Sequence, residues 1–312
     1  MAANYTDELL DLPQQYIPGK IGVVTILYNS GMVLPDFFES IERQEYRNFV
    51  VYCVDNASTD QSADLCQSRG EPFVVIRTGA NVGVAAGNNI GTRAAIEAGC
   101  EFVLYLNNDV VFGPELFARL VAGLATHACS MTTPLMYYHD RPNVIWAAGG
   151  YFQPWLGYRS LHTDVGNTDA SLDWEDRQVS FTPACCVLVR RELFAEIGIM
   201  DERYFAYFDD TDFMLRAWKR NKKLYLIPRA KLWHKVSSLS GFNSPYMIKN
   251  VTRNHALYNH KHVNSIGAWL LSALYCTYYL SMWIRGRMKR NEAFLRIEYW
   301  IDGIQIASQV SR

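Results

Sequence analysis

The fold is decided by the stretch Leu104-Tyr105-Leu106-Asn107-Asn108-Asp109-Val110. The apolar run from Phe102 to Leu106 has the composition of a strand that is buried on both faces. It ends in two amides and one carboxylate, and Gly113-Pro114 then breaks the chain before a helix. Ligands bind just outside the carboxyl ends of strands in an open parallel sheet, so these oxygen ligands indicate Mg²⁺ or Mn²⁺ carrying a phosphate. The simpler alternative is that Asp109 only caps a turn.

The composition is that of a chain with a large core and nearly balanced charge. The 312 residues include 30 basic and 31 acidic side chains, a net charge of −1 that argues against nucleic acid as a partner. The aromatic content of eight Trp, 19 Tyr and 15 Phe suits a large core, sugar stacking or a membrane interface. The seven Cys contain no Cys-x-x-Cys pair, so neither a zinc site nor a disulfide framework is indicated, and a cytoplasmic setting fits.

Three β-α units precede the central strand. Strands are expected at residues 21–27, 49–54 and 73–77, and each is followed by polar residues and then by a helix. This alternation predicts an α/β fold with a mostly parallel, Rossmann-like sheet and helices on both faces. Residues 130–182 are expected to be less regular, with short strands and an irregular loop. Residues 1–20 are expected to form a leader segment without the regions of a signal peptide.

A run of small residues follows the third strand. Gly83 and Gly87, between Asn81 and Asn89, open a helix and let backbone amides approach a phosphate or a sugar. Close helix packing explains these glycines equally well. No Gly-Lys-Ser/Thr closes the run as in a P-loop, and the first β-α turn lacks the glycine fingerprint of a nicotinamide-dependent enzyme.

A second chemical cluster lies at residues 204–216. Asp209 and Asp210 stand side by side behind an aromatic run, where crowding and desolvation raise a carboxyl pKa towards that of a general base. Acids that merely complement the dipole of the helix they open are the simpler explanation for one or two of them. Further on, a strand is expected at 224–227, and His234 follows an edge segment as a metal ligand or a structural histidine.

The segment 265–284 contains no charged residue, and Arg285, Arg287, Lys289 and Arg290 follow it directly. Its length permits a membrane-spanning helix. Its many Tyr, Trp, Ser and Gly residues instead favour a helix at the membrane interface, in peripheral contact through residues 265–290. A helix packed on the protein or in an oligomer is the remaining alternative.

Taken together, the motifs resemble those of the inverting, GT-A-fold glycosyltransferases of family 2, especially bacterial rhamnosyltransferases and galactofuranosyltransferases. The resemblance covers residues 21–262. Its carriers are residues 25–29, 54–60, 81–83, 87–89, 106–109, 208–212, 233–234 and Arg253-Asn254. It implies a domain at 21–262, with a donor half at 21–126 and an acceptor half at 127–262, followed by a helical segment at 263–312.

The resemblance also implies a role for individual residues. The implied donor-binding residues are Thr25, Leu27, Asn29, Asp55, Asn81, Gly83, Asn88, Asn107 and Asn108. Asp109 stands at the end of the family's DxD motif, so Asp109 and His234 would hold Mg²⁺ or Mn²⁺. Asp210 matches the family's catalytic base, and Asp209 stands beside it where Glu is commoner. Trp155 and Asp212 are expected to contact the acceptor.

The implied activity is inverting transfer of a sugar from a nucleoside-diphosphate sugar (dTDP or UDP) to a glycan. The favoured acceptor is a lipid-linked bacterial surface glycan. The Asn-Asn-Asp form of the metal motif favours dTDP-rhamnose, and a UDP-linked galactofuranose, galactose or glucose is the alternative donor. This activity implies a location at the cytoplasmic face of the inner membrane, and an oligomer is compatible with it. An inactive nucleotide-binding scaffold is the alternative from another class, against which the intact Asp109 and Asp210 argue.

Overall fold

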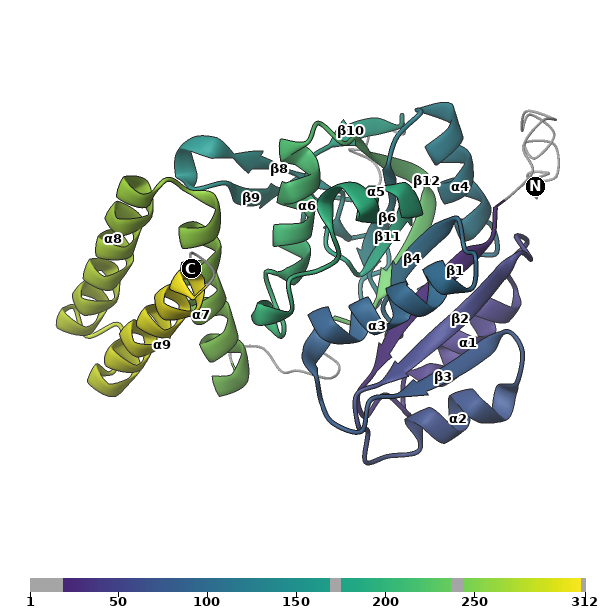
Figure 1. Ribbon diagram of the computed structural model, residues 1–312, viewed down its shortest axis with the longest axis horizontal. Helices are drawn as coiled ribbons and strands as arrows, with labels where there is room; N and C mark the ends of the chain where they lie inside the picture. Colours follow the sequence, from purple (N-terminus) through teal and green to yellow (C-terminus); the bar gives the residue numbers. More distant parts are fainter. Residues whose placement is uncertain (1–18, 169–174, 237–243, 310–312) are drawn as a thin grey trace.

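The computed structural model of the chain describes residues 19–168, 175–236 and 244–309. Nearly all of the expected leader, residues 1–18, lies outside this range. Among the described residues, ten strands form one mixed sheet with helices on both faces, and three further helices lie at one end (Figure 1). This arrangement confirms the predicted α/β class with a C-terminal helical segment.

The large sheet has the order β10-β12-β6-β11-β4-β1-β2-β3, with β5 beside β12 and β7 beside β6. Strands β1, β2, β3 and β4 are parallel, and β11 runs antiparallel between β4 and β6. The bounds are β1 Ile21–Leu27, β2 Phe49–Asp55, β3 Phe73–Arg77, β4 Phe102–Leu106, β5 Val110–Phe112, β6 Met131–Tyr138, β7 Ile145–Ala147, β10 Arg177–Val179, β11 Cys186–Arg190 and β12 Leu224–His234. A separate hairpin joins β8 (Gly150–Gln153) to β9 (Arg159–His162).

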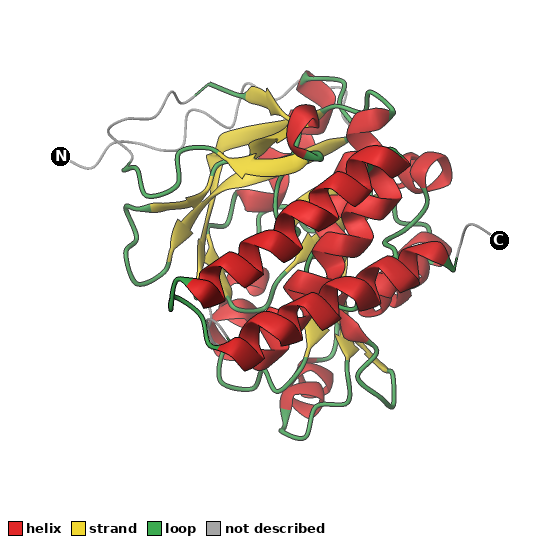
Figure 2. Ribbon diagram, turned by 90° about the vertical axis from the view of Figure 1, so that its left-hand side faces the viewer, coloured by secondary structure: helices red, strands yellow, loops and turns green. Residues whose placement is uncertain are grey.

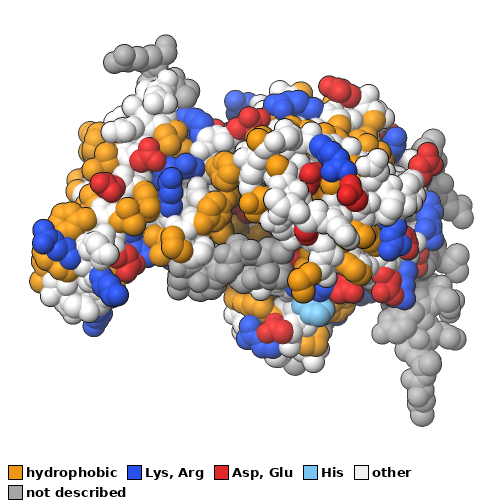
Figure 3. All heavy atoms as spheres, turned by 90° about the horizontal axis from the view of Figure 1, so that it is seen from below, with side chains coloured by type: hydrophobic (Ala, Val, Ile, Leu, Met, Phe, Trp, Pro, Cys, Tyr) orange, Lys and Arg blue, Asp and Glu red, His pale blue; other side chains and the backbone are white. Residues whose placement is uncertain are grey.

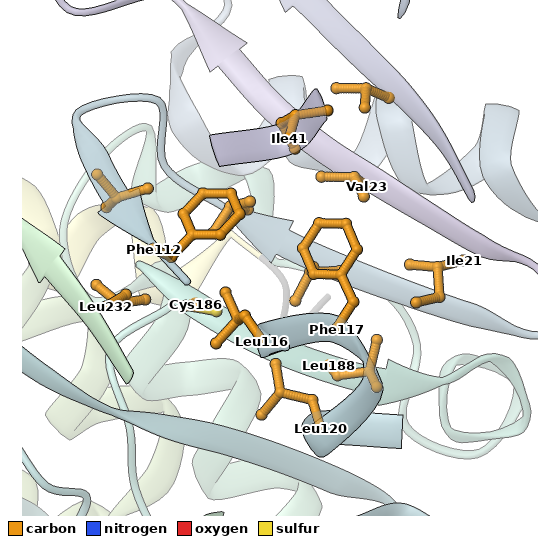
Figure 4. Packing of buried hydrophobic residues seen from close by; sticks show 14 of the residues in the cluster. Ile21, Val23, Ile41, Phe112, Leu116, Phe117, Leu120, Cys186, Leu188 and Leu232 are labelled. Carbon is orange, nitrogen blue, oxygen red and sulfur yellow. The ribbon is translucent and has the colours of Figure 1, made fainter. Parts of the chain in front are cut away.

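Two apolar cores hold the helices against the sheet. Helices α1 (Leu34–Glu42), α2 (Ser62–Arg69) and α4 (Leu116–Thr126) cover one face. Helices α3 (Gly83–Glu97), α5 (Arg191–Ile197) and α6 (Asp209–Lys219) cover the other. Figure 4 shows the first core, where the stacked rings of Phe112 and Phe117, 5.9 Å apart, pack beside β1. Burial on both faces explains the uninterrupted apolar runs of β1 and β4.

The region expected to be irregular contains a long interior strand. β7, β8, β9 and β10 have three or four residues, as expected for this region, whereas β6 has eight residues and lies between β11 and β12. The signal was masked because Thr132, Thr133 and Pro134 interrupt the apolar run, and a proline argues against a central strand. The Thr132 hydroxyl donates to the Leu120 carbonyl, the Thr133 hydroxyl bonds Thr182, and β12 bulges opposite Pro134. β12 itself is one strand through residue 234, longer than the predicted 224–227.

Three long helices complete the chain. Helices α7 (Pro245–His262), α8 (Ser265–Ile284) and α9 (Arg290–Ser308) lie together in front of the sheet in Figure 2. Trp300 of α9 is fully buried among them and stacks on Tyr275 of α8 with centroids 4.6 Å apart. None of the helices in the described part of the chain is both long and apolar enough to cross a membrane.

Candidate active site

The parallel strands bring the predicted donor residues to one edge of the sheet. Leu27 at the end of β1 is in register with Asp55 at the end of β2, which is in register with Arg77 at the end of β3. On the other side of β1, the side-chain amide of Asn108 donates to the Ile26 carbonyl at 2.7 Å. The segment after β4 is therefore fastened to β1, and Asn107 beside it is exposed.

The loops after β1 and β2 are hydrogen-bonded to each other. Asn29 accepts from the backbone N–H of Thr59 at 2.8 Å, and its own N–H donates to the Ser58 hydroxyl at 3.1 Å. Asp55 is buried, and its Oδ1 accepts from the Ser58 N–H at 3.1 Å. Its Oδ2 lies 4.0 Å from the Arg77 guanidinium, which makes Arg77 a basic neighbour that the sequence did not indicate. Asn29 and Asp55 thus shape one rim of the edge.

Thr25 and Leu27 lie inside the strand. Leu27 is fully buried in the core against α1, so only its backbone borders the edge. The hydroxyl Oγ1 of Thr25 is buried and has no hydrogen-bond partner among the described residues. Such an unpaired buried hydroxyl is costly unless a ligand or water completes it.

The first backbone N–H groups of the helix that starts at Gly83 bind a carbonyl of the protein itself. The backbone N–H groups of Val84 and Ala85 donate to the Phe205 carbonyl at 2.5 and 3.4 Å. A Cβ at Gly83, which has a φ of +87°, would lie 2.5 Å from that carbonyl. The glycine is therefore explained by close packing, the alternative weighed from the sequence. Asn81 accepts from the Gly83 N–H at 3.1 Å, and the amide of buried Asn88 contacts the Met200 sulfur at 3.5 Å.

Asp109 and His234 form the candidate metal site. Asp109 precedes β5 and His234 ends β12, and the pairing of these two strands brings Asp109 Oδ1 within 3.2 Å of His234 Nε2. Adjacent ligands of one octahedral cation, each at about 2.1 Å, lie roughly 3 Å apart, so the pair fits a single Mg²⁺ or Mn²⁺ ion. In the described ranges no three His, Cys, Asp or Glu side chains form a potential metal cluster. A two-residue set fits an ion that takes its other ligands from phosphate and water.

His234 is held between an aromatic ring and two acidic groups. Its imidazole packs edge-on against Trp146 with ring centroids 4.3 Å apart. Burial lowers the pKa of His234, but the neighbouring Cys185 and Asp109 outweigh it and raise the pKa to about 10. In the metal-free pair this proton lies between His234 and Asp109, and a cation held by both residues would displace it.

Asp209 and Asp210 begin α6, and the structure gives them different surroundings. Asp209 is buried, whereas Asp210 is partly exposed. Burial, followed by repulsion from Asp210, raises the pKa of Asp209 to about 8. Burial also raises the pKa of Asp210, partly offset by N–H groups of Ala184 and Thr211 and by the charge of His162 on β9. The accessible carboxyl with a raised pKa is the one suited to general-base chemistry.

A short turn before β11 joins the two clusters. The Ala184 N–H donates to Asp210 Oδ2 at 3.3 Å, and the Cys185 carbonyl accepts from the Asn107 N–H at 2.9 Å. The Cys185 thiol also lies beside His234. Residues far apart in sequence therefore meet around this turn. No pattern in the sequence singled out Ala184 or Cys185, because their contacts depend on the antiparallel pairing of β11 with β4.

The loop before Asp209 is held from α7. The amide Nδ2 of buried Asn254 donates to the carbonyls of Tyr204, Ala206 and Tyr207 at 2.6, 2.7 and 2.8 Å. Within this loop Phe205, Tyr207 and Phe208 all have positive φ, between 57° and 68°. Such backbone is strained for side-chain-bearing residues and persists only where its surroundings hold it. Asn254 supplies that restraint immediately before the two acids.

Neither expected acceptor residue lies in the open edge of this site. Asp212 is fully buried, and its carboxylate is bound by His262 Nε2 at 2.7 Å, Lys261 Nζ at 2.6 Å and Arg216 Nε at 2.8 Å. The acceptor role expected for Asp212 finds no support in this geometry, because cations of α6 and α7 surround it. Trp155 is 77% exposed at the tip of the β8–β9 hairpin.

Comparison with protein families decides the identity. The model of glycosyl transferase family 2 matches residues 22–198, more than half of the chain. The chain belongs to this family. The protein is therefore a glycosyltransferase that takes its sugar from a nucleotide sugar, which confirms the resemblance noted from the motifs.

This family 2 glycosyltransferase has curated relatives and a similar solved structure. N-acetylglucosaminyl-diphospho-decaprenol L-rhamnosyltransferase of Mycobacterium tuberculosis is 27% identical over 240 residues, 70% of this chain and 77% of that protein. The dTDP-rhamnosyl transferase RfbF of Shigella flexneri is 24% identical over 236 residues, 72% of this chain and 74% of that protein. The crystal structure of GalNAc-T7 with UDP, GalNAc and Mn²⁺ has a TM-score of 0.60 at 18% identity, over 75% of this chain and 47% of that chain. The last likeness establishes the fold.

Proposed function

We propose that this glycosyltransferase moves L-rhamnose from dTDP-rhamnose, with inversion, to a hydroxyl of a lipid-linked bacterial surface glycan. The names of two relatives, at 24% and 27% identity, support rhamnose. A lipid-linked acceptor places the enzyme at the cytoplasmic face of the inner membrane, in peripheral contact through residues 265–290. In this proposal residues 21–126 bind the donor and residues 127–262 bind the acceptor. The helical segment 263–312 follows them.

Asp210 is the base in this proposal. Its carboxylate takes the proton of the acceptor hydroxyl, whose oxygen forms a bond to the anomeric carbon as the bond to the diphosphate oxygen breaks. The nucleoside diphosphate leaves with the electron pair on the face opposite the attack, so one displacement inverts the centre. Burial raises the pKa of Asp210. Asp209 is buried beside it with a pKa of about 8 and holds its proton at neutral pH, which leaves Asp210 as the carboxylate of the pair.

Asp109 and His234 would hold Mg²⁺ or Mn²⁺, which when bound neutralises the diphosphate and improves it as a leaving group. The donor would lie along the edge formed by the ends of β1, β2 and β4. There Asp55 and Asn29 border the nucleotide, and exposed Asn107 borders the diphosphate. Asn81, Asn88 and Asn108 would support this edge from behind through the contacts described above. The Thr25 hydroxyl, which has no partner among the described residues, would be completed by the donor or by a water molecule.

One observation carries the proposal. The turn at Ala184-Cys185 contacts Asp210 on one side and Asn107 and His234 on the other. These contacts support the proposal of a base and a metal pair around the same few residues. A nucleotide-binding scaffold has no need of a partly exposed carboxyl with a raised pKa at this position.

A thermal-shift panel tests the proposal. The wild-type protein and Asp109→Ala would be incubated with dTDP, UDP, GDP or NAD, each with and without Mn²⁺. We expect dTDP with Mn²⁺ to raise the Tm of the wild type most, because a ligand stabilises the state it binds. Asp109→Ala should lose the metal-dependent part of that rise. A response to UDP alone would replace rhamnose by a UDP-linked sugar, and no response to any nucleotide would overturn the proposal.

A further inference from the structure

The outer face of α8 is apolar along its whole length. Ile266, Leu270, Leu274 and Tyr278 recur every four residues and therefore lie on one side of the helix. They are 78%, 67%, 62% and 50% exposed, and Trp269 beside them is 58% exposed. Large contiguous exposed apolar surfaces of this kind mark interaction sites.

The tip of the β8–β9 hairpin extends this face. Trp155 and Leu156 at the tip are exposed, and a Cβ on the adjacent Gly157 would lie 2.8 Å from Leu271 of α8. The Tyr258 hydroxyl of α7 donates to the Tyr158 carbonyl at 2.9 Å and fastens the hairpin at this point. Figure 1 shows the hairpin reaching from the sheet to the C-terminal helices. Two segments more than one hundred residues apart therefore form one exposed apolar surface, here called the docking face.

The charged residues along α8 and directly after it have one sign. No acidic residue occurs between positions 264 and 291, while Arg285, Arg287, Lys289 and Arg290 are all exposed where α8 ends. Figure 3 shows hydrophobic side chains over this end of the molecule, with Lys and Arg side chains and some Asp and Glu side chains between and beside them. Trp and Tyr at the rim of an apolar face, next to a basic cluster, complement the interface and the anionic headgroups of a bilayer.

The opposite end of the hairpin reaches the proposed base. His162, the last residue of β9, interacts electrostatically with Asp210. Gly150, the first residue of β8, bridges to Phe181, three residues before Ala184. Phe152 of β8 packs on Trp218 of α6, so the hairpin is also held to the helix that carries Asp210. Each strand of the hairpin has four residues and spans about 13 Å.

We propose that the docking face, made by α8 and the tip of the β8–β9 hairpin, binds the surface of an anionic lipid bilayer. The hairpin then leads from the bilayer to Asp210, so that an acceptor anchored by its lipid presents its sugar to the base. Trp155 meets the lipid side of this path. The path to Asp210 rests on the proposed lipid-linked acceptor. The docking face deepens the proposed peripheral contact through residues 265–290, and its test needs neither donor nor acceptor.

Flotation with lipid vesicles tests the docking face on the full chain. Vesicles of phosphatidylcholine with and without phosphatidylglycerol would be mixed with the wild type, Leu270→Glu/Leu274→Glu, Trp155→Glu and Arg285→Glu/Arg287→Glu. We expect the wild type to bind the anionic vesicles and each variant to bind at least about tenfold less, since each removes apolar or basic contact. Val74→Glu is the matched control, because Val74 is 43% exposed and lies on β3 at the other end of the molecule. This variant should bind the vesicles as the wild type does.

Several outcomes would overturn the proposal. Equal binding of the α8 variant and the wild type would remove α8 from the surface, and equal binding of Trp155→Glu would remove the hairpin. A wild type that ignores vesicles but forms a dimer, which Leu270→Glu/Leu274→Glu converts to a monomer in sedimentation, would assign the face to a second copy of the chain. Nucleotide-induced thermal shifts of the same samples report separately on the proposed function, so the two failures are distinguishable.

Discussion

Two neighbouring carboxyl groups can have different chemical roles when their exposure to solvent differs. Asp209 and Asp210 share a helix start, yet only Asp210 is partly exposed and bound by the Ala184 turn. Asp210→Asn keeps the shape of the side chain but cannot accept a proton. We expect kcat to fall by about 10²–10⁴-fold, the usual contribution of a general base, with nucleotide binding unchanged.

Steady-state transfer assays with purified protein check this expectation. Asp140→Asn is the control, because the Asp140 side chain is 78% exposed in the turn after β6. If Asp210→Asn kept the turnover of the Asp140→Asn protein, Asp210 would not be the base.

Asp209 makes stability depend on pH. Its folded pKa, about 8, lies above the ordinary value of 3.8, so the folded state binds more protons than the unfolded state between these values. Stability contributed by this proton is present at low pH and is lost as pH rises towards the folded pKa. Asp209→Asn removes the cost of the buried charge. Its Tm should exceed that of the wild type more at about pH 8 than at about pH 5. A difference that stays constant with pH would refute the raised pKa.

The sequence indicated Asp109, His234 and Asp210 as candidate site residues because each stands where a strand or helix begins or ends. It could not separate Asp210 from Asp212, which opens the same helix but whose carboxylate is bound by Lys261 and His262, about fifty residues away in the sequence. Nor could it indicate Cys185, whose contacts arise only when β11 pairs with β4. The local sequence pattern indicates which chemical groups lie near the site. Tertiary contacts determine which of these groups can still bind a ligand or take a proton.

Helix α3 begins where a carbonyl from another segment fills the space beside Gly83. Gly83→Ala would place a Cβ 2.5 Å from the Phe205 carbonyl and displace the loop before Asp209. Gly79→Ala is a matched control, because Gly79 also has positive φ, +75°, but has no atom within 4 Å of its Cβ position. Urea unfolding should show that Gly83→Ala loses at least about 1 kcal/mol more than Gly79→Ala. Equal losses would mean that the contact with Phe205 has no energetic role.

Helix α7 acts on the site through the loop 204–208. Asn254→Ala removes three hydrogen bonds to carbonyls of that loop. We expect kcat to fall at least about tenfold with the donor KM little changed, because Asn254 positions Asp210 and touches no donor residue. Amide hydrogen exchange at residues 205–208 should rise in parallel. Asn291→Ala, at an exposed position of α9, is the control. An unchanged kcat together with faster exchange would mean that the order of this loop does not affect catalysis, which would contradict the positioning role of Asn254.

Strands and helices could be predicted where the pattern of apolar residues in their sequences is regular. β1 and β4 are buried on both faces and were readable as apolar runs. β6 was not, because Pro134 lies inside it opposite the irregular pairing between Ile227 and Lys231 of β12. A bulge in the partner strand is a tertiary property that the sequence of β6 does not carry.

At the scale of the whole molecule, α7 connects the sheet to the C-terminal helices. Its Asn254 and His262 contact residues of the loop before α6 and of α6 itself, while Gly303 of α9 lies against its backbone at Arg253. The proposed boundary after residue 262 therefore falls between two packed helices.

Titration calorimetry of nucleotide binding tests the central claim most directly, that one edge of the sheet holds metal, donor and base in separate roles. The account predicts that dTDP binds the wild type and Asp210→Asn with similar Kd in the presence of Mn²⁺, and at least about tenfold more weakly without it. Asp109→Ala should bind weakly in both conditions, and both variants should transfer sugar far more slowly than the wild type. Binding of dTDP and UDP to Asp109→Ala that equals the wild type, with the same response to Mn²⁺, would contradict the account.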